Sequence, residues 1–126
     1  MNQTISPPTL ITFKELCEKH KINPSCGHVG PGWSILLDKL IIDLKQIGWD
    51  DDLQQVKEKF GVLRFYIGKG SEEIHIRIDK SEEESSVTCE DCGSAGHLTN
   101  LSGWLKTLCD SCQLESIAHK NSKPAP

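Results

Sequence analysis

The sequence has no long uninterrupted apolar run. Its longest apolar stretch, residues 35–44, is interrupted by Asp38, Lys39 and Asp43. A membrane-spanning helix needs about 20 predominantly apolar residues, so we expect no membrane helix and no membrane partner. Residues 1–8 also lack the basic start and the apolar run of a secretory signal. We therefore expect a cytoplasmic protein.

Positive charge is also scarce. The 126 residues include 14 lysines and arginines against 18 aspartates and glutamates, a formal net charge of -4. A protein that coats nucleic acid normally carries a clear positive excess, so bulk charge gives no support to a nucleic-acid partner. The length suits one compact domain, or one domain with a small appended module.

Disulfides are a poor interpretation of the six cysteines, because they form in oxidising compartments and we find no secretory signal that would direct the chain there. Four of them form two pairs, Cys89-x2-Cys92 and Cys109-x2-Cys112, separated by sixteen residues. This spacing is typical of a zinc site, since two intervening residues let a tight turn present both sulfurs to one tetrahedral ion. The sequence predicts one structural Zn²⁺. Four thiolates leave no open position for water or substrate, which argues against a catalytic metal.

The segments around these pairs predict the shape of the module. Gly93 permits the backbone to curl around the metal. Strand-like pieces at residues 97–99 and 104–108 are followed by a helix-like segment, residues 113–119, whose first turn would hold the second cysteine pair. We expect a treble-clef-like or zinc-ribbon-like four-cysteine zinc module over residues 87–119. Its negative charge makes it a poor phosphate clamp and favours contact with another protein.

The rest of the chain predicts a small α+β body over residues 10–86, with flexible ends at residues 1–9 and 120–126. Two helices are expected, one capped by Thr12 and one over residues 33–47, where apolar residues follow a 3.6-residue period. Residues 62–67 are β-branched and aromatic, which is typical of a strand. Residues 53–59 fit a strand or an irregular segment. The segment after Gly70 fits either type, and we favour a helix.

A second group of possible metal ligands lies near the N-terminus and consists of Cys17, His20, Cys26 and His28. Their spacing matches no standard site. The competing interpretation makes Cys17 a core residue and Cys26 a loop thiol. A catalytic Cys26 with His28 as its base is disfavoured, because no partner to orient the base is apparent. We predict no catalytic residue.

A possible binding surface lies outside the cysteine module. On a strand, Arg64 and Tyr66 share one face, and Lys57 and Lys59 lie close in sequence. The turn at residues 30–33 could hold an anion or could aim Trp33 into the core. The full set of candidate surface residues is Lys57, Lys59, Arg64, Tyr66, Trp33 and Trp104.

Four motifs occur in order along the chain: GW-x2-LL-x2-L at residues 32–40, QVKEKFGVLRFY at 55–66, TCEDCG-x2-G at 88–96 and GWLKTLCD at 103–110. Over residues 24–115 the chain resembles a family of small uncharacterised proteins from bacteria and phages that join an α+β body to a C-terminal zinc knuckle pair. The resemblance implies a fold outline, a helix after Gly70 and a metal site, but no activity. A histidine often replaces the last cysteine in related chains, whereas Cys112 completes a four-thiolate site here.

The leading hypothesis is a zinc-stabilised, non-enzymatic protein that acts through protein contact, as an accessory or host-modulating factor in a bacterial cell or phage-infected host. One alternative is a protein that sequesters a small anionic ligand at the lysines, Arg64 and the turn at residues 30–33. Another is a metal-dependent enzyme acting on nucleic acid, which needs histidines around an open metal position. Only His97 and His119 lie in or beside the module.

Overall fold

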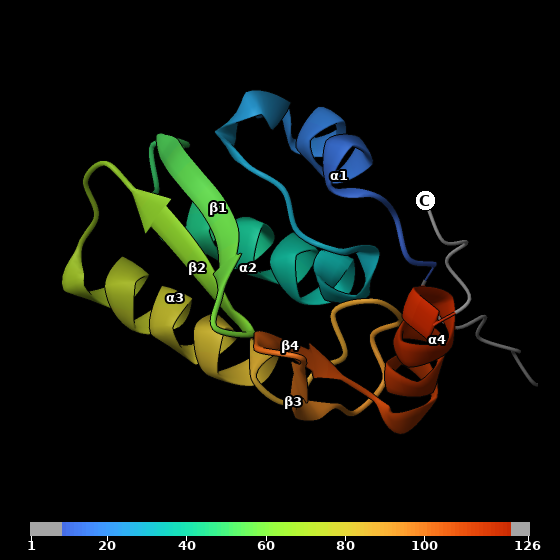
Figure 1. The fold of residues 1–126 in the computed structure, drawn as a ribbon. Helices are drawn as coiled ribbons and strands as arrows, with labels where there is room; N and C mark the ends of the chain where they lie inside the picture. The colour runs from blue at the N-terminus through green and yellow to red at the C-terminus, as the bar shows by residue number, and fades with distance from the viewer. Residues whose placement is uncertain (1–8, 122–126) are drawn as a thin grey trace, which may run out of the picture.

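The computed structural model describes residues 9–121, so most of the two predicted flexible ends lies outside the described residues. In these residues the chain forms four α-helices, two short 3-10 turns and two antiparallel hairpins (Figure 1), which confirms the α+β class. In the described range no helix has the length and apolar character to cross a membrane.

The first helix, α1 (Phe13–His20), begins as the capping pattern predicts. The Thr12 hydroxyl accepts a hydrogen bond from the Glu15 N-H at 3.1 Å, and the Glu15 carboxylate accepts one from the Thr12 N-H at 2.9 Å. The helix ends at Lys21, in the left-handed conformation. Its apolar side packs into the core through Phe13 and its neighbours, and two 3-10 turns, Pro24–Cys26 and Pro31–Trp33, follow.

The helix α2 (Ser34–Gln46) is the centre of the body. Its 3.6-residue apolar period places five fully or almost fully buried side chains on one stripe: Leu36, Leu37, Leu40, Ile41 and Leu44. The chain leaves the helix through Gly48, whose φ of 96° is one that glycine adopts without strain. The helix predicted over residues 33–47 is confirmed.

The strands β1 (Leu53–Lys59) and β2 (Val62–Ile67) form one antiparallel hairpin. Residues 53–59, which the sequence left open between strand and irregular structure, are therefore a strand. The hairpin lays Val56, Leu63 and Phe65 on the core. Its tight turn uses Phe60 and Gly61, both with positive φ.

The segment after Gly70 is the helix α3 (Glu72–Ser85), as we favoured. The Ser71 hydroxyl caps it by accepting a hydrogen bond from the Ile74 N-H at 3.2 Å. Ile74 and Ile78 are buried, while Ile76 between them is exposed. The alternating isoleucines therefore follow a helical stripe rather than a strand.

Both edges of the β1–β2 hairpin form hydrogen bonds with other parts of the body. On the β2 edge, the Leu63 N-H donates to the Ser85 hydroxyl at 2.9 Å and the Phe65 N-H donates to the Glu82 carboxylate at 3.0 Å. On the β1 edge, the His28 N-H donates to the Val56 carbonyl at 3.2 Å. Side chains of α3 and the loop before α2 thus take the hydrogen bonds that a third and a fourth strand would otherwise make.

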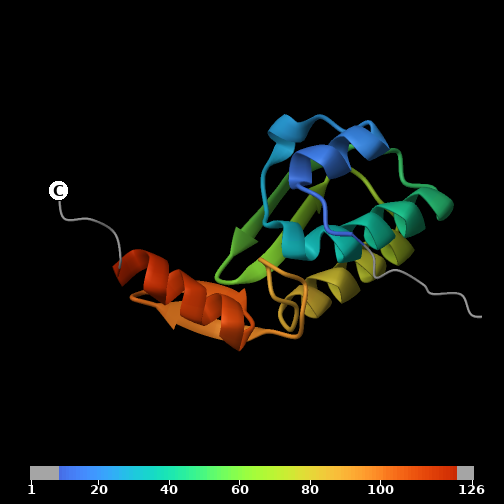
Figure 2. The same cartoon turned by 90° about the vertical axis from the view of Figure 1, so that its right-hand side faces the viewer.

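The C-terminal module consists of the turn at residues 89–92, the hairpin β3 (His97–Leu101) and β4 (Trp104–Leu108), and the helix α4 (Asp110–Asn121). This order of knuckle, hairpin and helix is that of a treble clef. Figure 2 shows the module at one end of the body, where the β1–β2 turn meets the β3–β4 hairpin.

Four hydrogen bonds fasten the module to the loop before α2 and to the β1–β2 turn. Three of them join the loop before α2 to residues 88–90: the Gly32 N-H donates to the Glu90 carbonyl at 2.7 Å, the Gly30 N-H to the Glu90 carboxylate at 2.9 Å, and the Trp33 indole N-H to the Thr88 carbonyl at 2.8 Å. The fourth runs from the Thr107 hydroxyl to the Gly61 carbonyl at 2.6 Å. The approach at Gly32 is so close that a Cβ there would lie 2.2 Å from the Cys89 carbonyl oxygen. Only glycine fits this contact.

Candidate metal centre and adjoining cleft

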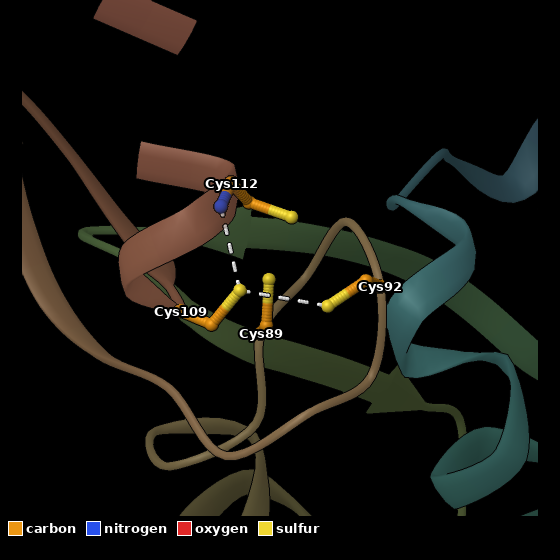
Figure 3. Close-up of side chains that lie close together, drawn as sticks. All are labelled: Cys89, Cys92, Cys109 and Cys112. Carbon is orange, nitrogen blue, oxygen red and sulfur yellow. Dashed lines mark hydrogen bonds between the residues drawn. The ribbon is translucent and has the colours of Figure 1, made fainter. Parts of the chain in front are cut away.

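The four paired cysteines come from two turns that face each other (Figure 3). Cys89 and Cys92 lie on the turn that follows α3. Gly93 closes this turn: its φ is 82°, and its N-H donates a hydrogen bond to the Cys89 carbonyl at 2.9 Å. Cys109 directly precedes α4, and Cys112 lies in its first turn. The spacing of each pair thus brings both of its sulfurs toward one point.

The sulfurs have the separation that a tetrahedral ion requires. All four Sγ atoms lie within 4.8 Å of one another, and those of Cys92 and Cys109 are 3.6 Å apart. Two sulfurs at about 2.3 Å from one tetrahedral ion would be roughly 3.8 Å apart. The Cys112 N-H also points at the Cys109 sulfur, at 3.4 Å. The four cysteines therefore form a group that could hold a metal ion.

The thiols of this group differ in acidity. Burial raises the pKa values of Cys89 and Cys112. Hydrogen bonds from the hydroxyl and the backbone of Ser94 lower the pKa of Cys92 to about 6. Four thiolates this close repel one another, so their joint ionisation requires a cation among them.

The second group of predicted ligands does not assemble. Cys17 and Cys26 are neighbours, but the His20 ring bonds to the Asp38 carboxylate at 2.7 Å and the His28 ring packs edge-on against a phenyl ring of α1. Among the side chains of residues 9–118, Cys89, Cys92, Cys109 and Cys112 are the only group found that could hold a metal ion. Burial raises the pKa of Cys17 to about 12 and also raises that of Cys26, which suits core thiols and not nucleophiles.

The structure places the residues of the predicted binding surface in two different environments. Lys57 and Arg64 are direct cross-strand neighbours, and the Lys57 ammonium lies 5.9 Å from the centre of the Tyr66 ring. Trp33, by contrast, is 0% exposed. Its indole fills the core beneath the module, where its N-H is bonded to Thr88, so it offers nothing to a partner.

A cleft of about 480 Å³ lies between the body and the module. It brings together Lys57 of β1 and Trp104 of β4, two candidate residues that are far apart in the sequence. Three further lining residues were considered in the sequence for other roles: Gly30 and Pro31 in the turn at residues 30–33, and His28 as a possible metal ligand. Sequence reasoning missed the other four, because they come from separate segments; they are Glu58, Glu90, Asp91 and Lys106. Of these four, only Lys106 could have been found from the sequence, because it lies two positions after Trp104 on the same strand and its side chain points to the same side of the sheet.

The three carboxylates of the cleft already have partners. Glu58 accepts a hydrogen bond from the Gly61 N-H at 2.6 Å, and Asp91 pairs with Lys106 at 3.0 Å. Glu90 accepts from the Gly30 N-H, and burial raises its pKa.

The nuclease alternative would need histidines around an open metal position. His97 lies 3.6 Å from the Asp110 carboxylate on the exposed side of the module. The side chain of His119 lies outside the described part of the chain.

Comparisons with protein families, with curated proteins and with solved structures gave no match. The resemblance drawn from the ordered motifs therefore stays a prediction.

Proposed function

We propose that this chain is a zinc-stabilised, non-enzymatic binding protein that acts through contact with another protein, as an accessory or host-modulating factor in the cytoplasm of a bacterial or phage-infected cell. The observation that carries this proposal is Trp104, which is 59% exposed at the cleft between body and module, whereas Trp33 and Trp49 are buried. Exposed tryptophans are enriched at protein interfaces, where they supply a large apolar contact.

Zinc is the metal that suits the cysteine group. Thiolate ligands select soft or borderline metals, and a tetrahedral set of four is typical of structural zinc. Such a shell is closed, so the metal would fold the module and not bind substrate. A reducing cytoplasm would keep the thiols available for it.

Further apolar side chains are exposed on the module that carries Trp104. Leu98 of β3 is 55% exposed and Leu114 of α4 is 67% exposed. The body exposes some large apolar side chains as well, Phe60 and Ile76 among them, but buries most of its large apolar side chains in one core, whereas Leu108 is the large apolar side chain that the module buries. An uneven distribution of exposed apolar groups is expected where a partner covers part of a small domain.

The test is affinity capture from nuclease-treated bacterial lysate with the wild-type chain and with Trp104→Ala. A matched control is Ile76→Ala, which shortens a similarly exposed apolar side chain on α3. We expect a polypeptide that wild type and the control retain and that Trp104→Ala loses. If no polypeptide depends on Trp104, the proposed function is wrong.

A second candidate function, sequestration of a small anionic ligand, is favoured by the cleft itself. Its volume suits a small molecule, and Lys57 and Lys106 both line it. Native mass spectrometry of protein purified without chelator would show this ligand as mass beyond chain plus one zinc. A spectrum with zinc alone would favour protein contact.

A further inference from the structure

Each strongly exposed aromatic ring in the described part of the chain has a lysine beside it. The ammonium groups of Lys57, Lys59 and Lys106 lie 5.9, 5.9 and 5.4 Å from the ring centres of Tyr66, Phe60 and Trp104. These rings are 41%, 67% and 59% exposed. All three pairs belong to the β1–β2 hairpin or to the cleft beside it, so positive charge and aromatic surface are concentrated on one region of a protein with a net charge of -4.

The outer face of the β1–β2 hairpin carries no acid. Residues directly opposite each other in an antiparallel pair point to the same side, and Val56 and Phe65 define the inner side. The outward residues of the hairpin are Gln55, Lys57, Lys59, Val62, Arg64 and Tyr66. This face therefore holds three cations, a tyrosine and no compensating carboxylate of its own.

The closest cations on this face are arranged unfavourably for folding. Lys57 and Arg64 lie directly opposite each other, and like charges in that position destabilise a hairpin. Arg64 is relieved by the Glu82 carboxylate on α3, at 3.6 Å. Across residues 9–121 no ion pair joins Lys57 to a carboxylate. An anion supplied from outside would relieve this repulsion.

We propose that the surface formed by the outer hairpin face and the cleft binds an acidic segment of the partner protein. Its carboxylates would lie against Lys57 and Arg64, and an apolar or aromatic side chain would enter the cleft against Trp104. This inference rests on the proposed function and names the chemistry of the partner.

The wall of the cleft favours a polypeptide over a nucleic acid. Glu58, Glu90 and Asp91 line it, and a strand that carries one phosphate per nucleotide would bring negative charge against all three. A polypeptide can keep its carboxylates on the hairpin and place an uncharged side chain in the cleft.

Tryptophan fluorescence tests the proposal directly, because Trp104 is exposed while Trp33 and Trp49 are buried. The probes are a random glutamate–tyrosine copolymer, a lysine–tyrosine copolymer of the same length and a thymidine dodecanucleotide, each added to zinc-loaded full-length chain with excitation selective for tryptophan. We expect the glutamate–tyrosine copolymer to shift the emission and to bind about tenfold more weakly at high salt. The other two probes should bind at least tenfold more weakly than it does.

Lys57→Glu is the decisive variant. It places a glutamate opposite Arg64, so the melting temperature should not fall, while affinity for the glutamate–tyrosine copolymer should fall at least tenfold. Lys39→Glu makes the same change in net charge on the exposed side of α2 and should bind as wild type does. If both variants lost the same affinity for the copolymer, the loss would come from net charge alone, and the proposal would be overturned.

Two further results would contradict the proposal that the partner's segment is acidic, without contradicting the proposal that the chain acts through protein contact. One is tighter binding of the oligonucleotide than of the glutamate–tyrosine copolymer. The other is capture of a Trp104-dependent polypeptide by a chain that does not bind this copolymer. The failure of the inference and the failure of the proposed function are therefore distinguishable.

Discussion

Removing the metal is expected to loosen the body as well as the module. The four hydrogen bonds that join the module to the loop before α2 and to the β1–β2 turn all involve residues of the module that flank the cysteines: Thr88, Glu90 and Thr107. At about 1 kcal/mol each, they contribute roughly 4 kcal/mol, against a total stability of about 5–15 kcal/mol for a domain. Loss of the metal should therefore remove a large fraction of the stability of the body.

The assay is urea unfolding and amide hydrogen exchange with and without a zinc chelator. The N-terminal amides of α2, which follow the fastened loop at Gly30 and Gly32, should lose protection together with the amides of β4. Cys109→Ser should reproduce the effect, and Cys26→Ser, the same replacement in the body, should not. Unchanged protection in α2 after the metal has left would refute this reasoning and define two independent units.

Three smaller perturbations test a contact between module and body, the metal group and a contact between α1 and α2. Thr107→Val keeps the side-chain shape but leaves the buried Gly61 carbonyl without its donor, so the melting temperature should fall by roughly 3–10 °C, while Thr107→Ser should recover most of the loss. Acid should release the metal, because protons compete for the four thiolates; full loading at about pH 4, measured with a zinc-binding dye, would contradict this. Burial raises the pKa of Asp38, but hydrogen bonds from His20 and Lys19 outweigh it and lower that pKa below its usual value. The carboxylate therefore stabilises the fold above about pH 4, and wild type should lose its advantage over Asp38→Asn in urea unfolding as the pH falls through the lowered pKa.

Local patterns predicted the elements better than the contacts between them. The cysteine spacing identified the metal group because a knuckle is set by a few consecutive residues, and the Thr12 capping box and the α2 stripe are equally local. The docking of the module was not predictable, because Gly30 and Glu90 meet across 60 positions.

Exposure was the least predictable property of the site. Trp33 and Trp104 each directly follow a glycine, yet one is fully buried in the core and the other lies exposed at the cleft. The difference arises from where the module packs, since residues 88–90 cover the loop that carries Trp33. No local pattern contains that information.

The hydrogen-bonded edges of the β1–β2 hairpin limit how other chains can associate with it. A two-stranded sheet with free edges invites a third strand, from a partner or from another copy of itself, and such pairing can propagate into aggregates. Glu82 and Ser85 bond to the N-H groups of Phe65 and Leu63 on one edge, and the loop at His28 bonds to the Val56 carbonyl on the other. A partner that added a strand would have to displace these contacts, which favours recognition through side chains, whose identity differs between proteins, over recognition through the backbone, which is common to all of them.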